Sequence, residues 1–238
     1  MINGGRPLIS LEGVTKVYKT KAGPLEAIKG VDFQVGEGEF VAIVGPSGSG
    51  KSTLINMITG IDRPTSGEVF VAGERLTNMS ENKVAKWRGR NVGVVFQFFQ
   101  LLPTLTVLEN VIMPMNYTGT YKGKRRQRAM EMLDLVKLTD VVDKYPSQIS
   151  GGQQQRAAIA RALVNNPSVL VGDEPTGNLD AESAARVFQL FGTLVQHGTT
   201  IVMVTHDRDL AGQIPRVVEV RDGQLVSESE VDHRLVAR

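Results

Sequence analysis

The hydrophobic and polar positions of the chain follow two patterns, one typical of strands and one typical of helices. Short runs of apolar and β-branched residues predict strands, and they lie at 8–18, 27–35, 40–44, 68–72, 91–97, 169–174 and 199–205. Stretches with helical periodicity or a polar, helix-forming composition predict helices, and they lie at 54–58, 80–88, 129–138, 151–163 and 181–196. Strands that alternate with helices predict an α/β domain, and 238 residues are enough to bury one large core.

Turn-forming residues predict where several of these elements begin or end. Gly23 and Pro24 predict a turn between the first two strands. Asp222 and Gly223 predict the turn of a small hairpin over 216–226. The charged residues beyond Glu228 predict a frayed C-terminal end.

A glycine-rich segment lies between the strand at 40–44 and the helix at 54–58. It fits the spacing G-x-x-x-x-G-K-[ST] of a phosphate-binding loop in the strand–loop–helix context that this motif requires. Backbone N–H groups of such a loop surround a polyphosphate, Lys51 would hold its β and γ oxygens, and Ser52 would hold Mg²⁺. The segment consists of Gly45, Pro46, Ser47, Gly48, Ser49, Gly50, Lys51, Ser52 and Thr53. We therefore predict a P-loop fold that binds a nucleoside triphosphate.

Two acidic residues follow the apolar strand that begins at Val169. A buried strand that ends in Asp beside a phosphate loop typically supplies a carboxylate for Mg²⁺, here Asp173. Glu174 is one residue further, where a carboxylate could polarise a water in line with the γ-phosphate. The second acid favours hydrolysis of the nucleotide over its storage.

Three other polar or aromatic residues at strand ends have two interpretations each. Tyr18 could pack against its neighbours or stack on a purine base. Gln97 could cap its strand, or it could ligate Mg²⁺ or orient the attacking water. His206, after the strand at 199–205, could be structural or could donate a hydrogen bond to the γ-phosphate.

The segment Ser150, Gly151, Gly152 and Gln153 opens a helix and predicts a second anion site. Free N–H groups and a hydroxyl at a helix start bind anions. Because the chain already has its phosphate loop, two copies facing head to tail would let this segment reach the nucleotide of the partner. The alternative is an ordinary N-cap.

The segment between the strand at 91–97 and this helix has a different composition. Pro103, Pro114 and Pro146 separate stretches of helical periodicity, which predicts an all-helical insertion. Its basic run at 122–128 is typical of a solvated helix start, and a face for anionic lipids or a partner is the alternative. The apolar run at 98–102 indicates an interaction surface.

Composition excludes several classes of protein. Lys and Arg number 27 against 25 Asp and Glu, so the net charge of +2 gives no reason to expect nucleic-acid binding. The absence of cysteine excludes disulfides, thiolate metal sites and cysteine nucleophiles. No apolar run approaches the roughly 20 residues that span a bilayer, and the N-terminus lacks the apolar core of a signal peptide, so we expect a chain outside the bilayer.

The order of these motifs resembles the ATPase domain of an ATP-binding cassette (ABC) transporter over essentially the whole chain. The Ser-Gly-Gly-Gln segment is highly specific among them. The segments 95–103, 106–111 and 173–180 resemble the MacB/LolD branch, whose members serve macrolide exporters, lipoprotein-releasing complexes and related systems. The resemblance implies a P-loop NTPase with a RecA-like core, an N-terminal antiparallel β subdomain and an inserted α-helical subdomain. We expect one domain over 1–238, with its nucleotide-binding core at 1–97 and 151–238 and the helical subdomain at 98–150.

The resemblance also implies roles for the site residues, with ATP and Mg²⁺ as cofactors. Tyr18 would stack on adenine, Lys51 and the loop amides would hold phosphates, and Ser52, Gln97 and Asp173 would serve Mg²⁺. Glu174 would be the catalytic base and His206 the γ-phosphate sensor. Ser150, Gly152 and Gln153 would complete the opposite subunit's site, and Asp180 would cross the dimer interface. Two positions depart from the family: Ile149 replaces leucine, and Gly172 would loosen the strand before Asp173.

These expectations describe an ATP-hydrolysing subunit that forms a homodimer when ATP is bound. It would lie on the cytoplasmic side of the cell membrane and power a separate permease that exports or extracts a lipophilic, peptide or lipoprotein substrate. A cell-division-type ATPase that signals across the membrane without moving cargo is the alternative. A soluble ABC ATPase that acts on DNA or in cofactor assembly fits the compact chain poorly. The Ser-Gly-Gly-Gln helix and the pair Asp173 and Glu174 count against a P-loop kinase, which needs an acceptor site rather than a water-polarising acid.

Overall fold

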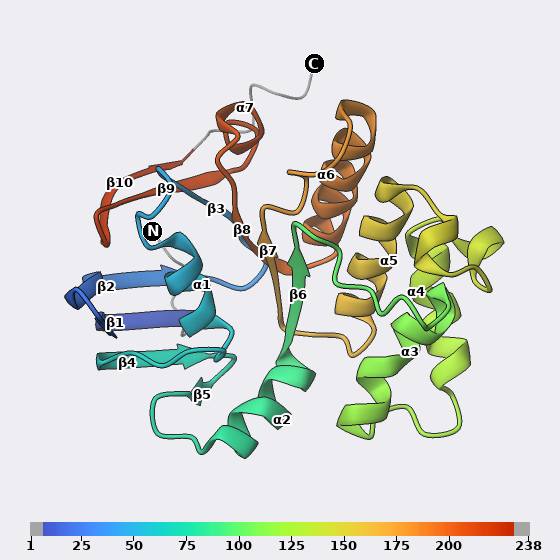
Figure 1. Cartoon of the computed structure of the whole chain (residues 1–238), viewed down its shortest axis with the longest axis horizontal. Helices are drawn as coiled ribbons and strands as arrows, with labels where there is room; N and C mark the ends of the chain where they lie inside the picture. The colour runs from blue at the N-terminus through green and yellow to red at the C-terminus, as the bar shows by residue number, and fades with distance from the viewer. Residues whose placement is uncertain (1–6, 231–238) are drawn as a thin grey trace.

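The computed structural model describes residues 7–230, which form two sheets with helices beside them (Figure 1). The first sheet is antiparallel and has the strand order β2-β1-β4-β5. Its strands are β1 (Ile9–Thr20), β2 (Gly23–Val35), β4 (Ser66–Val71) and β5 (Glu74–Arg75). This sheet confirms the antiparallel β part of the expected fold.

The second sheet contains the strands that carry the acids and the phosphate loop. Its order is β10-β9-β3-β8-β7-β6, and all neighbours are parallel except the β9–β10 hairpin. The strands are β3 (Phe40–Val44), β6 (Val92–Phe96), β7 (Val169–Asp173), β8 (Thr200–Val204), β9 (Arg216–Arg221) and β10 (Gln224–Glu230). Because β3, β7 and β8 are adjacent and parallel, the residues that follow them meet at one edge of the sheet.

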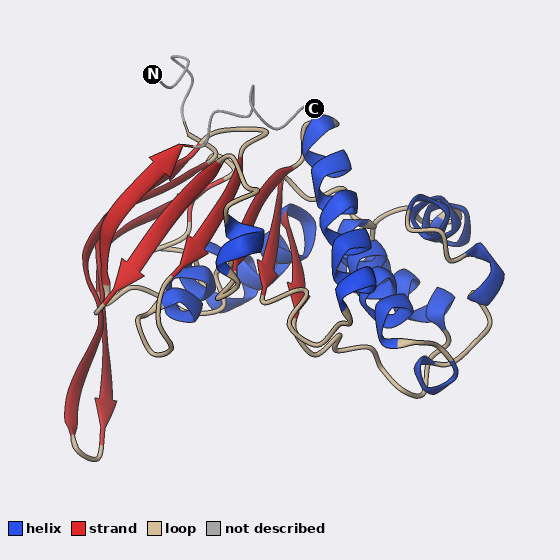
Figure 2. Ribbon diagram, turned by 90° about the horizontal axis from the view of Figure 1, so that it is seen from above, coloured by secondary structure: helices blue, strands red, loops and turns tan. Residues whose placement is uncertain are grey.

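The helices divide between the sheets and a separate group beside them (Figures 1 and 2). Capping boxes fix the starts of α3 at Thr106 and α5 at Ser150, where serine or threonine is followed three residues later by glutamate or glutamine. The bounds are α1 (Lys51–Ile58), α2 (Glu81–Asn91), α3 (Val107–Thr118), α4 (Arg125–Leu135), α5 (Gly151–Leu163), α6 (Ala181–Gln196) and α7 (Arg208–Ala211). Two 3₁₀ turns, η1 (Thr139–Val141) and η2 (Pro146–Gln148), lie between α4 and α5.

Two apolar clusters form the core. One joins the antiparallel sheet, α1 and one face of the parallel sheet, and includes Leu54 and Val171. The other joins the opposite face of the parallel sheet to α3–α6, and includes Leu170 and Phe191. The parallel strands are buried on both faces, which explains their continuous apolar runs. Within residues 7–230, no helix has the length and apolar character to cross a bilayer.

Several boundaries differ from the sequence predictions. Gly23 and Pro24 lie inside β2 and pair with Thr20 and Lys19, so the turn consists of Lys21 and Ala22. The hairpin is therefore longer than predicted, because the pairing between β1 and β2 continues through the two residues that favour a turn. β10 continues to Glu230 rather than fraying at Glu228, because its residues pair with β9. The rest of that prediction falls on 231–238, outside the described residues.

Gly172 does not interrupt its strand. It pairs with Val95 on β6 and Met203 on β8 and is buried. A Cβ at this position would lie 3.0 Å from Cγ of Pro175. The glycine therefore leaves room for the turn that follows Asp173.

The basic run is partly solvated and partly bound to the protein. Lys122, Lys124 and Arg126 are exposed, as a solvated helix start predicts. Arg125 donates hydrogen bonds to Thr120 O and Asn116 Oδ1. Arg125 therefore also fixes the loop between α3 and α4.

Candidate nucleotide site

The phosphate loop joins the end of β3 to the first turn of α1. Gly45 has φ 147° and Gly50 has φ 108°, a region that side chains strongly disfavour. A Cβ on Gly45 would lie 2.0 Å from Val220 O, and one on Gly50 would lie 2.6 Å from Ala27 O. Only glycine therefore lets the loop approach β9 on one side and β2 on the other.

The loop is also held by the turn of the β9–β10 hairpin. Gly223 N donates to Ser49 O at 2.9 Å, and Lys29 N donates to Gly223 O at 2.8 Å. The hairpin turn thus connects the phosphate loop to β2. The sequence predicted the turn at Asp222 and Gly223, but its position against the loop depends on the order of strands in the sheet.

Lys51 is the first residue of α1 and is only 8% exposed. Its Nζ donates to Gly45 O and Pro46 O, both at 2.8 Å. The ammonium group therefore lies inside the curve of the loop, at the positive end of the helix dipole. This combination suits a polyphosphate.

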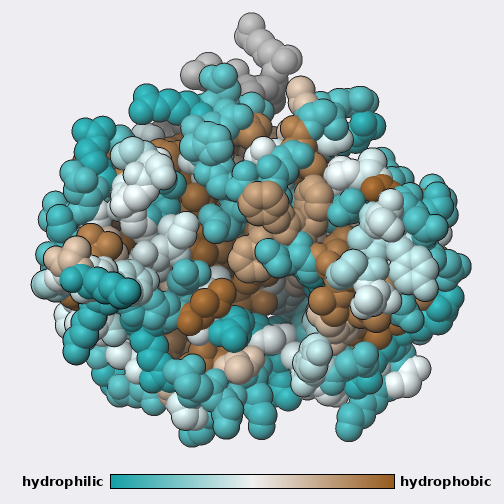
Figure 3. Space-filling model, viewed as in Figure 1, coloured by the Kyte–Doolittle hydropathy of each residue, from teal (hydrophilic) through white to brown (hydrophobic). Residues whose placement is uncertain are grey.

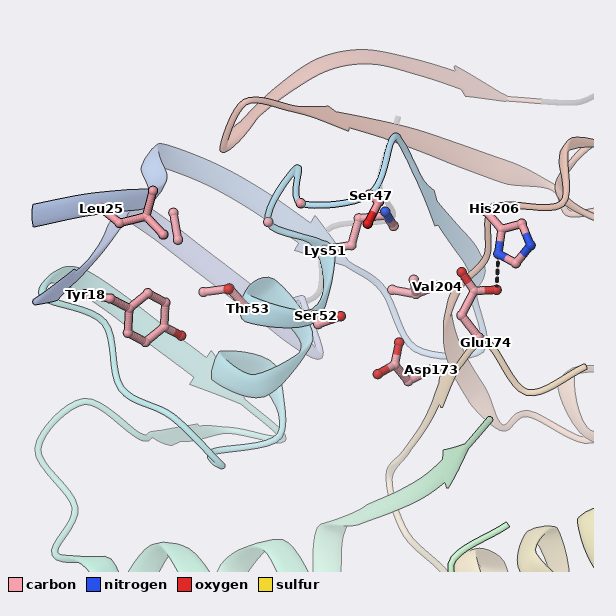
Figure 4. A pocket seen from close by; sticks show the side chains of 13 residues that line it. Tyr18, Leu25, Ser47, Lys51, Ser52, Thr53, Asp173, Glu174, Val204 and His206 are labelled. Carbon is pink, nitrogen blue, oxygen red and sulfur yellow. Dashed lines mark ion pairs between the residues drawn. The ribbon is translucent and has the colours of Figure 1, made fainter. Parts of the chain in front are cut away.

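A pocket of about 420 Å³ opens in front of the loop (Figure 4). It brings together ten of the residues predicted from the sequence. These are Tyr18, Ser47, Gly48, Gly50, Lys51, Ser52, Thr53, Asp173, Glu174 and His206. Leu25, Ala27 and Val204 also line the pocket and were not predicted. Tyr18 and Leu25 lie at one end and Glu174 and His206 at the other, with Lys51 and Ser52 between them.

Asp173 is the last residue of β7 and is half-buried beside the loop. Burial and the neighbouring Glu174 raise the pKa of its carboxyl above the usual value, and Lys51 opposes them. A bound cation would relieve this unfavourable burial of negative charge. The environment of Asp173 therefore favours a divalent cation with the nucleotide.

Glu174 has an unusual backbone conformation for its residue type. Its φ is +51°, in the left-handed region, and its N–H donates to Val204 O at 3.0 Å. Non-glycine residues in this region are uncommon and are often found at functional sites. The turn away from the strand direction brings the carboxylate to the pocket.

The Glu174 side chain contacts His206 directly. Oε2 of Glu174 lies 2.8 Å from Nδ1 of His206, and the two side chains are 18% and 71% exposed, respectively. Their strands, β7 and β8, are neighbours in the sheet. Sequence reasoning predicted both residues as parts of the site but not this contact, which follows from the adjacency of the two strands.

Gln97 lies outside this pocket and contacts the loop after β7. Its Nε2 donates to Asn178 Oδ1 at 3.5 Å, and Asn178 Nδ2 donates to Gln97 O at 3.1 Å. These hydrogen bonds link the end of β6 to the turn that follows Glu174. Asn178 lies in the segment 173–180 that carries part of the family resemblance, but no sequence pattern pairs it with Gln97.

The segment for which a second anion site was predicted lines a separate pocket of about 200 Å³ at the start of α5 and beside α6. It is lined by Ser150, Gly152, Gln153, Arg156, Ser183 and Arg186. Gln153 N donates to Ser150 Oγ at 3.3 Å, which confirms the N-cap interpretation, whereas the anion site stays a prediction. Gly152 is required here because a Cβ would lie 2.6 Å from Ser183 Oγ. Arg156, Ser183 and Arg186 were not predicted as lining residues.

Asp180 and Gly151 lie beside this second pocket. Asp180 caps α6 by accepting from Ser183 N at 2.9 Å and from Ser183 Oγ at 2.8 Å. These hydrogen bonds hold the pKa of Asp180 below its usual range. Gly151 begins α5, and a Cβ there would lie 3.5 Å from the ring of Phe99.

A family model described as ABC transporter matches residues 28–177, which include the phosphate loop and the start of α5. The chain belongs to the ABC transporter family. This member of the family is an ATP-binding and ATP-hydrolysing subunit. It is 46% identical over 220 residues to an uncharacterized ABC transporter ATP-binding protein of Thermotoga maritima, covering 92% of this chain and 94% of that protein.

Other relatives include proteins that carry a permease. The chain is 45% identical over 229 residues to the macrolide export ATP-binding/permease protein MacB of Nitrosomonas europaea, covering 96% of this chain and 35% of MacB. Among solved structures, the ATP-binding cassette MJ0796 in a dimeric post-hydrolysis state with ADP and phosphate superposes with a TM-score of 0.86. That cassette is 41% identical, and the match covers 94% of this chain and 99% of the cassette.

Proposed function

We propose that this ABC subunit hydrolyses ATP at two sites shared between two copies and thereby drives a separate membrane permease of the MacB type. The observation that carries the proposal is the pairing of Glu174 with His206 at the end of the pocket opposite Tyr18. A nucleotide with its base near Tyr18 and its phosphates at the loop would extend its terminal phosphate toward this pair.

The phosphates and the cation would be held by the middle of the pocket. Lys51 and the loop amides would bind the β- and γ-phosphates. Ser52 and Asp173 would hold Mg²⁺, and Gln97 would join them once the nucleotide is bound. Within residues 7–230, no group of three or more acidic, histidine or cysteine side chains forms a metal cluster. A hydroxyl and one carboxylate suit Mg²⁺, which takes few protein ligands and completes its shell with phosphate oxygens and water.

Hydrolysis would occur at the Glu174 end. The carboxylate of Glu174 would accept a proton from the attacking water. His206 would orient that carboxylate and donate a hydrogen bond to the charge that develops on the γ-phosphate. The positive φ of Glu174 supports this role, since strained backbone is retained where the surrounding structure fixes a functional group.

The pocket at the start of α5 would complete the site of a second copy. Ser150, Gly152 and Gln153 would contact the γ-phosphate held by the other chain, and Asp180 would lie at the interface. Arg156 and Arg186 add positive charge to this pocket. The dimeric state of the MJ0796 cassette supports a two-fold arrangement.

The permease would bind on the side of the helices and lie in the cell membrane, with this subunit on its cytoplasmic face. Apolar residues gather near the middle of the face in Figure 3. In the loop after β6, Phe98 is 68% exposed and Leu102 is 41% exposed. Export is favoured because two relatives, the macrolide export protein MacB and the pyoverdine export protein PvdT of Pseudomonas syringae, are export proteins. Each of them combines a related cassette with a permease in one chain.

Replacing Glu174 by Gln tests the proposed base. The amide keeps the size of the side chain but cannot take a proton, so we expect kcat to fall about 10²- to 10³-fold. Binding of Mg-ATP should be retained. Steady-state phosphate release and equilibrium nucleotide binding measure the two effects.

Glu131→Gln on α4 is the matched control, because Glu131 is exposed and lines neither pocket. It should leave turnover unchanged. Wild-type turnover in Glu174→Gln would contradict the assignment of the base.

The permease is tested separately, with the Glu174→Gln variant and Mg-ATP as bait in detergent-solubilised membranes of the native cell. Mass spectrometry should identify a membrane protein with few transmembrane helices and a large extracytoplasmic domain. Recovery of soluble partners alone would contradict the permease proposal while leaving the ATPase site unaffected.

A further inference from the structure

Tyr18 lines the pocket and is held by residues that lie behind it, outside the lining. Its hydroxyl donates to Asp62 Oδ2 at 2.7 Å, across 44 positions of the sequence. Tyr18 lies on β1 of the antiparallel sheet, whereas Asp62 lies in the loop that follows α1. The contact therefore connects the base end of the pocket to the helix that begins at the phosphate loop.

The Asp62 carboxylate is held from three directions. Besides the Tyr18 hydroxyl, it accepts from Lys16 Nζ at 2.6 Å and from Arg63 N at 2.7 Å, both at Oδ1. Burial alone would raise the pKa of Asp62, but these hydrogen bonds outweigh burial and hold the pKa below its usual value. Burial and the hydrogen bond to Asp62 raise the pKa of Tyr18. Both directions agree with an ionised carboxylate that accepts from a neutral phenol.

Lys16 holds the same tyrosine from a second side. Its Nζ lies 4.8 Å from the centroid of the Tyr18 ring, within the range of a cation–π contact. The same Nζ donates to Arg63 O at 2.7 Å. The Lys16 and Asp62 side chains are only 13% and 27% exposed, so this pair is better shielded than an ordinary surface ion pair.

The loop that carries Asp62 is fixed to α1. Ile61 N and Asp62 N both donate to Asn56 O, at 2.8 Å and 3.0 Å. The loop is also joined to β1, because Val17 N donates to Thr65 Oγ1 at 2.9 Å. The position of Asp62 is thus determined by the phosphate-loop helix.

We propose that Asp62 and Lys16 are positioning residues for nucleotide base recognition, which hold the ring of Tyr18 at a fixed place relative to the phosphate loop. This inference rests on the proposed contact between Tyr18 and the base. A platform whose ring is already fixed loses less conformational freedom when the base stacks on it. Asp62 and Lys16 therefore act on the affinity for the nucleoside and not on the chemistry at the γ-phosphate.

The test compares a ligand that has a base with one that lacks it. For Asp62→Ala we expect the Kd for Mg-ATP and the KM to rise about five- to tenfold, less than the full loss of stacking when the ring is removed. The Kd for Mg-tripolyphosphate and the value of kcat should change less than twofold. Asp62→Asn keeps an acceptor for the Tyr18 hydroxyl and should retain most of the affinity.

Tyr18→Phe is the second variant, since it removes only the hydroxyl and keeps the ring. It should weaken Mg-ATP binding in the same direction, and the double variant with Asp62→Ala should be no weaker than Asp62→Ala alone, because the two changes break one contact. Glu68→Ala is the control, because it removes an exposed ion pair with Arg75 in the same sheet. It should leave both ligands unaffected.

Two results separate failure of this inference from failure of the proposed site. If Tyr18→Ala weakens Mg-ATP but not Mg-tripolyphosphate while Asp62→Ala and Tyr18→Phe leave both unchanged, the positioning role is wrong and the base contact stands. If Tyr18→Ala also leaves the ratio of the two affinities unchanged, the base contact itself is wrong. Equal weakening of both ligands by Asp62→Ala would make Asp62 a purely structural residue.

Discussion

The pocket at the phosphate loop is lined by residues of β1, β2, the loop with α1, and β7 and β8 with the turns that follow them, whereas the pocket at the start of α5 is lined by α5 with its N-cap and by α6. The first contains a buried lysine and the two carboxylates of Asp173 and Glu174. The residues that line the second are serine, glycine, glutamine and arginine, with no carboxylate among them.

This difference indicates that the two pockets have different roles. In the proposed function, the first pocket holds ATP within one chain and its Glu174 activates the water. The second offers hydroxyl, amide and guanidinium donors, which suit the outer side of a bound phosphate but cannot activate water. Binding and hydrolysis should therefore respond differently to changes in the two pockets.

Replacing Ser150 by Arg should give the largest difference between the effect on ATP hydrolysis and the effect on ATP binding. The longer side chain would occupy the second pocket and prevent a partner's nucleotide from approaching, so we expect turnover to fall by at least about 10²-fold. The Kd for Mg-ATP should stay within about twofold of wild type, since Ser150 does not line the first pocket. Equilibrium binding and phosphate release measure both. Unchanged turnover would contradict the shared site.

Replacing Gly50 by Ala should damage the first pocket through its backbone. A Cβ would lie 2.6 Å from Ala27 O at a φ of 108°, so we expect a loss of about 2–4 kcal/mol in the free energy of unfolding and weaker Mg-ATP binding. Denaturant unfolding measures the stability.

Gly192→Ala on α6 is the control, because a Cβ there meets nothing within 4 Å. This change should raise the free energy of unfolding by up to about 1 kcal/mol. If Gly50→Ala were as stable as wild type, the steric account of the loop would be wrong.

Replacing Asp173 by Asn should have the smallest effect on the free energy of unfolding, and this effect should depend on pH. The folded chain raises the pKa of this carboxyl above 3.8, so ionisation is less favourable in the folded than in the unfolded state. Below the unfolded pKa both states are protonated and the carboxyl has no effect on stability. As pH rises through the folded pKa, wild type loses stability relative to the amide variant.

Without nucleotide we therefore expect Asp173→Asn to be more stable than wild type at neutral pH, by less than about 1 kcal/mol because solvent reaches the carboxylate. The difference should shrink as pH falls toward 4. Thermal unfolding across this range checks the sign, and a difference that grows on acidification would contradict it. Mg²⁺-dependent ATP binding should weaken in the same variant.

Contiguous motifs in the sequence predicted most of the first pocket. The phosphate loop directly follows β3, Asp173 is the last residue of β7 and Glu174 follows it, so their place at the end of a buried apolar strand could be inferred locally. The antiparallel and parallel sheets followed from the family resemblance rather than from the pattern alone. The boundaries at 98 and 150 remain a prediction.

Contacts between elements could not be predicted in this way. Leu25 faces Tyr18 across the β1–β2 hairpin, but Gly23 and Pro24 indicated a turn where the strand continues. The Glu174–His206 contact depends on β7 and β8 being neighbours. Asp62 lies in a loop without a recognisable motif, and only the folded chain brings it to Tyr18.

The central claim is that each hydrolytic site needs both pockets, one from each of two chains. The most direct test is the molar mass in solution of Glu174→Gln with saturating Mg-ATP, compared with the Glu174→Gln/Ser150→Arg double variant, by light scattering during gel filtration. We predict the mass of two chains for the single variant and of one chain for the double variant, with ATP bound to both. A single variant that stays monomeric with ATP bound, or a double variant that dimerises equally well, would contradict the account.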